Sequence, residues 1–454
     1  MKLSRRQLFL GGASLALPTL LIPRAARAAT RAHGAAEHVL VLFAKGGFRS
    51  HATFNAVGTR RDNPWGAQPA APGTEWALGA AVGAEDYATT LGTVPAFARQ
   101  TREVAVIPCV DHTPGERSVD VDHRTALNRI ATGSPEGKSG LLSVVGRLLP
   151  RYAQGFSASA FPPVELGATE FGLGAGDYAS TRPLSISGAD AVFRSDSPLG
   201  QGWRVDARAA LDARFRERRS RAFRQRLSDF IRAKGYAVEL AGRLTEPVLD
   251  VRGQPMAREA GVSNAELLSV LGDYGLGALG DLEDPRSWGA DVAFALRFFG
   301  LGAPMCVVTR DLYDLHDRER ENYAPRATDL VRQLAGLRFL LPRMSHPNGG
   351  TYWDKTLVVV LSEFSRNNTG DEGFNSGNGS DHVAERTGPT RNQAIAVMGG
   401  MVTAAGKRLG ETDDAMNARG PVYSSRSLLA TLLDVLGVDS SALWADAPIQ
   451  ELFS

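Results

Sequence analysis

Acidic residues and a histidine follow one apolar run of the sequence at short spacing. The run Leu357–Leu361 is followed directly by Ser362 and Glu363, and the Gly/Asn-rich loop after it ends in Asp381 and His382. An uninterrupted apolar run is typical of a strand buried on both faces of a parallel sheet, and residues just past its carboxyl end face the ligand crevice. Carboxylates and an imidazole at that place predict a site for a hydrolytic divalent metal, zinc or manganese. A solvated loop whose carboxylates contact only water is the alternative.

A second segment repeats this design. The apolar run Met305–Val308 is followed by a polar turn that carries Asp311, Asp314 and His316. Asp314 and His316 are two residues apart, so their side chains lie on the same side of an extended segment. The chain has only eight histidines, and two of them follow buried-strand patterns beside acids. We therefore predict one shared metal or polar catalytic site; two separate, locally hydrogen-bonded loop histidines are the alternative.

The amino-terminal residues predict export. Ser4–Leu10 contains a twin-arginine pattern, an apolar stretch runs from Leu8 to Ile22, and Ala26–Ala28 is an A-x-A site, so we expect cleavage before Ala29. The alternative is an uncleaved membrane anchor, but two glycines and a proline interrupt the apolar stretch, which is short for a span. The expected location is the periplasm or the medium, with the twin-arginine translocon as the partner during export and no stable membrane span after cleavage.

Cleavage also changes the charge balance. Residues 1–28 contain five basic residues and no acid, so their removal takes the formal net charge from +2 to −3. The whole-chain pI of 8.5 therefore overstates the basicity of the mature protein, and we expect no nucleic-acid partner. The basic stretch Arg204–Arg226 has apolar residues interleaved near helical spacing, which predicts an amphipathic helix with a solvated basic face. Contact of that face with anionic envelope polymers is the alternative.

Length and composition suit one large domain with an insertion, or two domains. About 425 residues remain after cleavage and 43% of the chain is hydrophobic, which is ample for a large core. The two cysteines, Cys109 and Cys306, each belong to an apolar run. They can pair in an oxidising compartment only if their strands are adjacent; two buried free thiols are the alternative.

Apolar runs alternate with helical patterns along the mature chain. Besides the two strands at the candidate site, we expect strands at His38–Ala44, Val104–Pro108 and Asn392–Met398 and helices at Ser139–Leu149, Pro325–Met344 and Ser424–Leu436. This alternation predicts an α/β fold with a doubly wound, largely parallel sheet. The expected organisation is a signal peptide (1–28), a first part of the α/β domain (29–150), a cap or insertion of loops and the basic helix (151–285), and a second part with the predicted metal site (286–454).

Several short motifs together resemble one protein family. They are Gly46-Gly47 after the first strand, Asp122-His123-Arg124, Gly140-Leu141-Leu142, the turn Arg310–His316, Ser362-Glu363-Phe364-Ser365-Arg366 and Gly379-Ser380-Asp381-His382. In combination, over most of the mature chain, they resemble an uncharacterised family of twin-arginine-exported bacterial proteins in the alkaline phosphatase/sulfatase superfamily.

The resemblance implies an alkaline phosphatase-like fold with a metal site at the carboxyl ends of its strands. In that superfamily two divalent ions bridge a phosphate or sulfate ester and stabilise the attacking and the leaving oxygen. The ligands implied by position are Asp314, His316, Glu363, Asp381 and His382. His123 is implied to contact the substrate or the metal. The implied cofactor is one or two divalent ions, and the implied substrate is a small anionic ester.

The first turn departs from the pattern of that family. The family has an acid where this chain has Arg49, in the run Gly46-Gly47-Phe48-Arg49-Ser50. A guanidinium has no acceptor and cannot ligate a metal, but it can bind phosphate or sulfate oxygens in bidentate fashion. Ser50 or Thr53 is then the candidate nucleophile, with an N-cap of the following segment as the alternative for each.

Three functions fit these residues. The first is an exported metal-dependent hydrolase of phosphate or sulfate esters. The second is a protein that has lost catalysis and binds an anionic ligand or an envelope partner. The third is a surface-associated structural protein that uses the basic stretch Arg204–Arg226.

Overall fold

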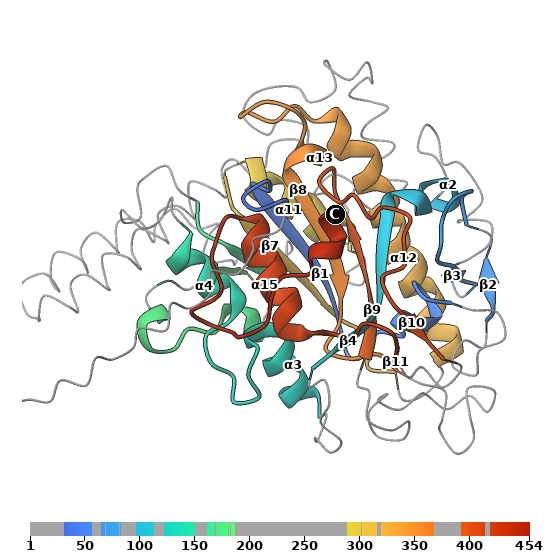
Figure 1. The fold of residues 1–454 in the computed structure, drawn as a ribbon, viewed down its shortest axis with the longest axis horizontal. Coiled ribbons are helices and arrows are strands. Elements are labelled where there is room, and N and C mark those ends of the chain that lie inside the picture. Colours follow the sequence, from blue (N-terminus) through green and yellow to red (C-terminus); the bar gives the residue numbers. More distant parts are fainter. Residues whose placement is uncertain are drawn as a thin grey trace, which may run out of the picture.

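An eight-stranded sheet forms the centre of the computed structural model (Figure 1). The structure describes residues 31–56, 65–68, 70–80, 82, 97–112, 122–149, 161–167, 169–179, 181, 183–186, 288–300, 302–315, 319–366, 392–413 and 418–454. The strands of this sheet are β1 (His38–Lys45), β4 (Val104–Asp111), β5 (Val164–Leu166), β6 (Leu184–Ile186), β7 (Met305–Asp311), β8 (Thr356–Leu361), β9 (Asn392–Met398) and β12 (Tyr423–Ser424). The α-helices are α2 (Phe97–Gln100), α3 (His123–Thr132), α4 (Leu141–Leu148), α11 (Gly289–Gly300), α12 (Glu319–Leu340), α13 (Tyr352–Lys355) and α15 (Ser425–Val435).

The strand order is β12-β4-β9-β8-β1-β7-β5-β6. The first strand of the chain, β1, lies near the middle and pairs in parallel with β7 and β8. Strand β9 is the exception, because it runs antiparallel to both β4 and β8. The prediction of an α/β fold with a mostly parallel sheet is confirmed. The direction of β9 could not be predicted, because its apolar run looks the same in either orientation.

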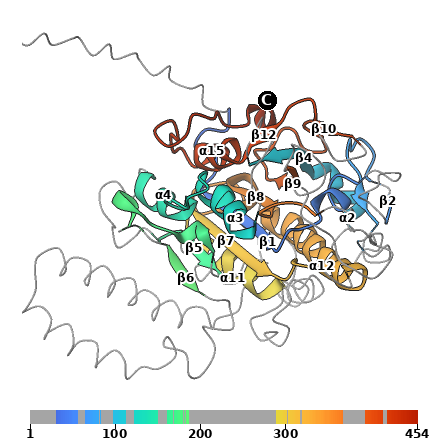
Figure 2. The same ribbon diagram turned by 90° about the horizontal axis from the view of Figure 1, so that it is seen from below.

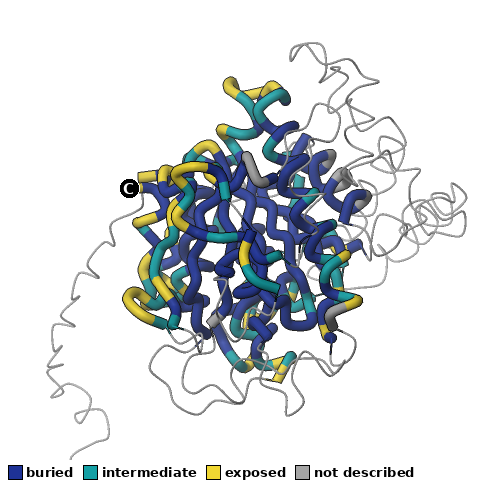
Figure 3. The backbone as a smooth tube through the Cα atoms, turned by 90° about the vertical axis from the view of Figure 1, so that its right-hand side faces the viewer, coloured by how far each residue is buried: buried dark blue, intermediate teal, exposed yellow. Residues whose placement is uncertain are grey.

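Two hydrophobic layers cover the two faces of the sheet. Along β1, Leu40 and Leu42 belong to one buried cluster with side chains of α11 and α12, and Val39 and Val41 belong to another with side chains of α3, α4 and α15. This division follows from the alternation of side chains along a strand. Figure 2 shows α11 and α12 on one side of the strands and α15 on the other. Figure 3 shows that the interior of the described chain is buried. The central strands β1 and β8 are buried along nearly their whole length, which is why their sequences lack polar alternation.

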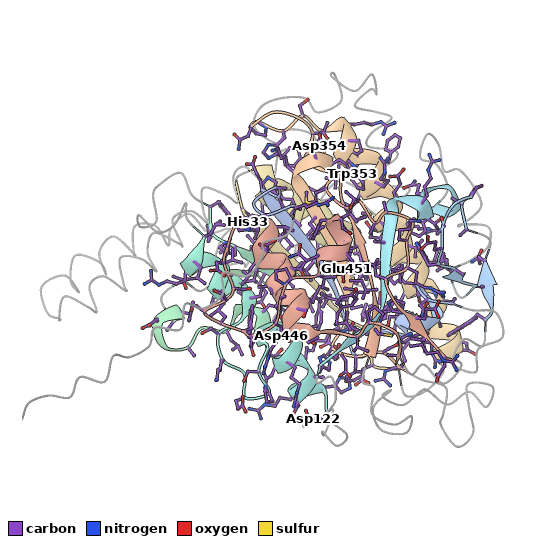
Figure 4. All side chains as sticks on the ribbon, in the orientation of Figure 1. His33, Asp122, Trp353, Asp354, Asp446 and Glu451 are labelled. Atoms are coloured by element: carbon purple, nitrogen blue, oxygen red, sulfur yellow. The ribbon has the colours of Figure 1, made fainter. Side chains whose placement is uncertain are left out.

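The segment before β1 docks on the last long helix. The amide of Gly34 donates to the carbonyl of Asp434 at 3.0 Å, and the amide of Ala36 donates to the carbonyl of Val435 at 2.9 Å. His33, labelled in Figure 4, places Nδ1 2.6 Å from Asp434 Oδ1. These contacts join the amino-terminal end of the described chain to its carboxyl-terminal part.

Part of the range expected to form an insertion belongs to the main sheet. Strands β5 and β6 pair with each other, and β5 also pairs with β7, all in parallel. The expected signal peptide (1–28) and the basic stretch Arg204–Arg226 lie outside the described residues. Across the described ranges, no helix combines the length and apolar character needed to cross a membrane.

The sheet order separates the two cysteines. Cys109 lies on β4 and Cys306 on β7, with three strands between them. Strands are spaced about 4.8 Å apart, which puts these two strands about 19 Å from each other, whereas a disulfide needs Cα atoms within ~7 Å. Both cysteines are buried free thiols, and burial raises the pKa of the Cys306 thiol well above its ordinary value.

We therefore expect two titratable thiols per chain when the protein is denatured without reductant, and almost none in the native protein. Because the free thiols are buried, a thiol reagent should react only after denaturant is added. The measurement is thiol titration with and without denaturant. A denatured, unreduced protein that shows no thiol would mean that the two cysteines are paired.

Candidate functional site

The polar residues predicted to carry chemistry lie at one edge of the sheet. The parallel strands β1, β7 and β8 all end there, and the last residue of β1, Lys45, is in register with Asp311 of β7. In Figure 4, Asp122 at the start of α3 lies at the lower end of the sheet, and Asp354, which precedes β8, lies at the upper end. The lower end is therefore the carboxyl edge, where ligand crevices of α/β sheets occur.

Glu363 is the buried centre of this edge. Its side chain has no exposed surface. Oε1 accepts a hydrogen bond from the Gly46 amide at 2.7 Å, and Oε2 accepts one from the Ser362 hydroxyl at 2.8 Å. A buried carboxylate needs such donors, because an unpaired charge in the interior is costly.

His123 links Glu363 to Asp314. It is the first residue of α3, whose N-cap Asp122 accepts a hydrogen bond from the Thr125 amide. Its Nδ1 lies 2.9 Å from Glu363 Oε1, and its Nε2 lies 3.4 Å from Asp314 Oδ1. The ring also contacts Phe364, with 4.9 Å between the ring centroids. Because a carboxylate only accepts, Nδ1 carries a proton, while Nε2 lies toward Asp314 and is itself buried, although the side chain as a whole is 32% exposed.

The surroundings of His123 favour its charged form. Burial lowers the pKa of this imidazole, but the hydrogen bond and charge of Glu363 and the charge of Asp314 together outweigh burial and the opposing charge of Arg366. The pKa of His123 is therefore raised above its ordinary value of 6.5. The raised pKa increases the protonated fraction of His123 at any given pH, and the protonated ring can act as a proton donor.

Arg366 completes the group. Its guanidinium is 1% exposed, contacts Asp314 Oδ1 through Nη2, and donates through Nε to the carbonyl of Gly46 at 2.9 Å. A Cβ added to Gly47 would lie 2.8 Å from Arg366 Nε. The missing side chain at Gly47 therefore makes room for the Phe364 ring, which is nearest, and for this guanidinium. The metal interpretation of the sequence did not assign Arg366 a role.

The rim carries a second charge pair beside this group. Lys45 Nζ donates to Asp311 Oδ2 at 2.6 Å. Burial lowers the pKa of Lys45, but the hydrogen bond and charge of Asp311 and the charges of Glu170 and Glu363 outweigh it, so the pKa is raised. Lys45 thus stays charged at this edge.

A second histidine, which the sequence interpretation missed, also contacts Glu363. His112 follows β4 directly; its Nδ1 lies 2.7 Å from Ser425 Oγ and its Nε2 contacts the carbonyl oxygen of Glu363. The signal was present, because Asp111-His112 follows an apolar run just as other predicted site residues do.

The turn after Gly47 was expected to carry a nucleophile, Ser50 or Thr53, beside an anion-binding Arg49. In the structure these side chains are buried and bond to the protein itself. The Arg49 side chain is fully buried and lies over the ring of Trp65, with 5.4 Å from Cζ to the ring centroid. Ser50 Oγ accepts a hydrogen bond from the Ala394 amide of β9, and the Thr53 hydroxyl bonds the Arg49 carbonyl and the Tyr323 hydroxyl. The N-cap alternative for Ser50 is wrong, because Arg49 is the N-cap of the short 3-10 helix Ser50–Ala52, and Thr53 is the C-cap of the same helix.

Two of the five predicted metal ligands are described. Asp314 and Glu363 meet through His123, as expected from their positions just after the ends of two parallel strands, β7 and β8, which lie on either side of β1. His316, Asp381 and His382 lie outside the described residues. Within the part of the chain that the structure describes, no three His, Cys, Asp or Glu side chains form a group arranged to hold a metal ion.

The sequence matches the family described as "Protein of unknown function (DUF1501)" over residues 36–448, and the chain belongs to that family. This match corrects the resemblance stated above, because the matching family is DUF1501 and the alkaline phosphatase/sulfatase superfamily is not supported. No curated protein sequence matches the chain.

One solved structure is similar to the chain at low level. It is described as Ps i-CgsB in complex with k-i-k-neocarrahexaose, with 11% identity, 92% of this chain and 75% of that chain covered, and a TM-score of 0.34. A likeness this loose supports no conclusion about fold or function.

The close approach of β1 to the turn after β7 predicts a specific effect of Gly46→Ala. Gly46 has φ +113°, and a Cβ there would lie 2.1 Å from the Asp314 amide nitrogen. We expect a loss of roughly 2–5 kcal/mol from left-handed strain and overpacking combined. The control is Gly73→Ala, with φ +86° and no atom within 4 Å of the added Cβ, which should lose only about 1–2 kcal/mol. Equal losses in urea denaturation would show that Asp314 is not held against Gly46.

Replacing Asp314 with Asn should lower the pKa of His123, because it removes one of the charges that raise it. The measurement is an NMR titration of the His123 ring, with Asp311→Asn as a control that changes an acid paired with Lys45 instead. In the wild type, a raised folded-state pKa contributes stability below about pH 6.5, and this is lost as the pH rises through the raised value. A His123 pKa unchanged by Asp314→Asn would contradict the proposed coupling.

Proposed function

We propose that this protein is an exported hydrolase of phosphate or sulfate esters in which His123 donates a proton to the leaving oxygen. One observation carries the proposal: a buried carboxylate, Glu363, holds one nitrogen of an imidazole whose other nitrogen faces the partly exposed carboxylate Asp314. A base oriented by a buried acid, with its second nitrogen directed to the reactants, is the arrangement used in nucleophilic and acid–base hydrolysis.

Glu363, His123 and Arg366 have different roles in the proposed hydrolysis. Glu363 fixes the orientation of the His123 ring through Nδ1, and Nε2, which lies toward Asp314 and is buried, must become accessible when an ester binds. In the proposed reaction a water oxygen bonds to phosphorus or sulfur while the bond to the leaving oxygen breaks. The leaving oxygen takes the Nε2 proton, and the proton of the attacking water passes to Asp314 or to solvent. Arg366, which contacts Asp314, contributes positive charge beside an anionic ester.

A divalent ion is part of the proposal. Carboxylates and imidazoles suit zinc or manganese in kind, but the Glu363 oxygens already accept bonds from Gly46, Ser362 and His123, and Asp314 contacts Arg366. Asp314 and Glu363 would therefore hold an ion only together with the predicted ligands His316, Asp381 and His382, and only if these pairs rearrange. A bound ion would supply charge stabilisation of the ester oxygens.

The placement of the first turn favours a second candidate function. The Arg49 guanidinium is buried and Ser50 is engaged with β9, so the pair expected to bind and attack an ester is turned into the protein. A protein that binds an anionic ligand or an envelope partner without turning it over is consistent with this placement.

Turnover of aryl phosphates and aryl sulfates by the mature protein tests the proposal. We expect kcat/KM to fall about 10²- to 10⁴-fold in His123→Gln, because general acid catalysis typically contributes that much, and to fall similarly in Glu363→Gln. His33→Gln is the matched control, since His33 also pairs with an acid but lies against α15.

Metal analysis of the same protein preparations separates the two candidates. Stoichiometric zinc or manganese that is lost in Glu363→Gln, together with turnover, would support the hydrolase. Saturable binding of phosphate or sulfate with no turnover, even after incubation with zinc and manganese, would overturn it in favour of the binding protein.

A further inference from the structure

Glu363 lies just beyond the end of strand β8, and its backbone is held there by side chains of other strands and segments. Strand β8 ends at Leu361, and its ladder with β9 joins Val358 to Met398 and Val360 to Ala396. Beyond that point a side chain replaces the strand partner: the Gln393 amide accepts from the Ser362 amide at 2.8 Å and donates to the Ser362 carbonyl at 2.6 Å. Ser362 is thereby held as if the strand continued.

His112 does the same for the next residue. It directly follows β4, which lies beyond β9 in the sheet, and its ring Nε2 contacts the Glu363 carbonyl oxygen. A carbonyl oxygen only accepts, so Nε2 carries the proton. In the neutral ring Nδ1 is then an acceptor, and the Ser425 hydroxyl, 2.7 Å away, donates to it. His112 and Ser425 are both buried, and Ser425 is the first residue of α15.

We propose that His112, oriented by Ser425, is a positioning residue that holds the Glu363 backbone so that its carboxylate reaches both Gly46 and His123. The carboxylate and the carbonyl belong to one residue, so a shift of the backbone moves the acceptor of both hydrogen bonds. The two histidines thus act on one residue in different ways: His123 bonds its side chain and His112 bonds its main chain. This inference rests on the proposed function only for its effect on turnover.

The Gly46 amide reports the position of the carboxylate without any assay of activity. It is buried and donates directly to Glu363 Oε1 at 2.7 Å. In His112→Phe, which keeps a ring but loses both hydrogen bonds, we expect hydrogen exchange at Gly46 to accelerate about tenfold or more relative to global unfolding. His112→Gln should restore slow exchange, because its amide can donate to the Glu363 carbonyl and accept from Ser425.

The matched control is His38→Gln at the other end of the sheet. His38 is also a buried histidine with a hydrogen bond to a backbone carbonyl, that of Ala303 at 2.7 Å. Its replacement disturbs the core of the same strand that leads to Gly46 and should leave Gly46 exchange unchanged relative to global unfolding. Acceleration in His38→Gln equal to that in His112→Phe would overturn the inference, because the effect would then be general.

Turnover gives a second readout. If the ester hydrolase activity exists, His112→Phe should lower kcat with little change in KM, and His112→Gln should recover most of it. Unchanged Gly46 exchange in His112→Phe overturns the positioning role whether or not any ester is hydrolysed. Accelerated exchange in a protein that hydrolyses no ester supports the positioning role of His112 and contradicts the proposed hydrolase function.

Ser425→Ala tests the part of the inference that concerns Ser425. Loss of turnover in Ser425→Ala with Gly46 exchange unchanged would overturn the positioning role, because Ser425 would then act on the substrate.

Discussion

The buried carboxylate of Glu363 is the interaction on which the candidate site depends. A charge without solvent contact persists only when donors surround it, and here the donors come from β1, from the neighbouring Ser362 and from α3. The same hydrogen bonds therefore close the sheet edge and bring His123 against it. In this molecule the site and the closed carboxyl edge of the sheet depend on the same contacts, because Glu363 bonds both Gly46 and His123 and Arg366 bonds both Gly46 and Asp314.

Charge pairing around this centre follows one pattern. Arg366 is matched by Asp314, and Lys45 by Asp311. In each pair the carboxylate is exposed, 46% for Asp314 and 62% for Asp311, and ion pairs with an exposed partner contribute little net stability. A cluster of charged groups at the carboxyl edge of an α/β sheet is, however, a common feature of functional sites. The partial exposure of His123 and Asp314, beside the complete burial of Glu363 and Arg366, separates groups that can meet a ligand from groups that orient them.

Local sequence patterns predicted the strands well, but they did not predict the contacts between residues that lie far apart in the sequence. The apolar runs at β1, β7, β8 and β9 were visible because both faces of these strands are buried, and the rule on strand ends brought Asp314 and Glu363 to one edge. The partners of Glu363 were not predictable in the same way, since Gly46 and His112 come from segments 317 and 251 residues away. Motif resemblance suggested a superfamily that the family match does not support, because short motifs report local chemistry rather than descent.

The central place of β1 has a kinetic consequence. The first strand of the chain pairs with β7 and β8, whose residues lie more than 260 positions later, and the segment before it docks on α15 near the end of the sequence. Contacts so distant along the chain require large loops to close before they bring any stabilisation, which slows folding. During synthesis β1 can pair only after β7 and β8 have been made. Until then the apolar run His38–Lys45 lacks its partner strands and can aggregate in the nascent protein. We expect this strand to be the segment that most needs a chaperone.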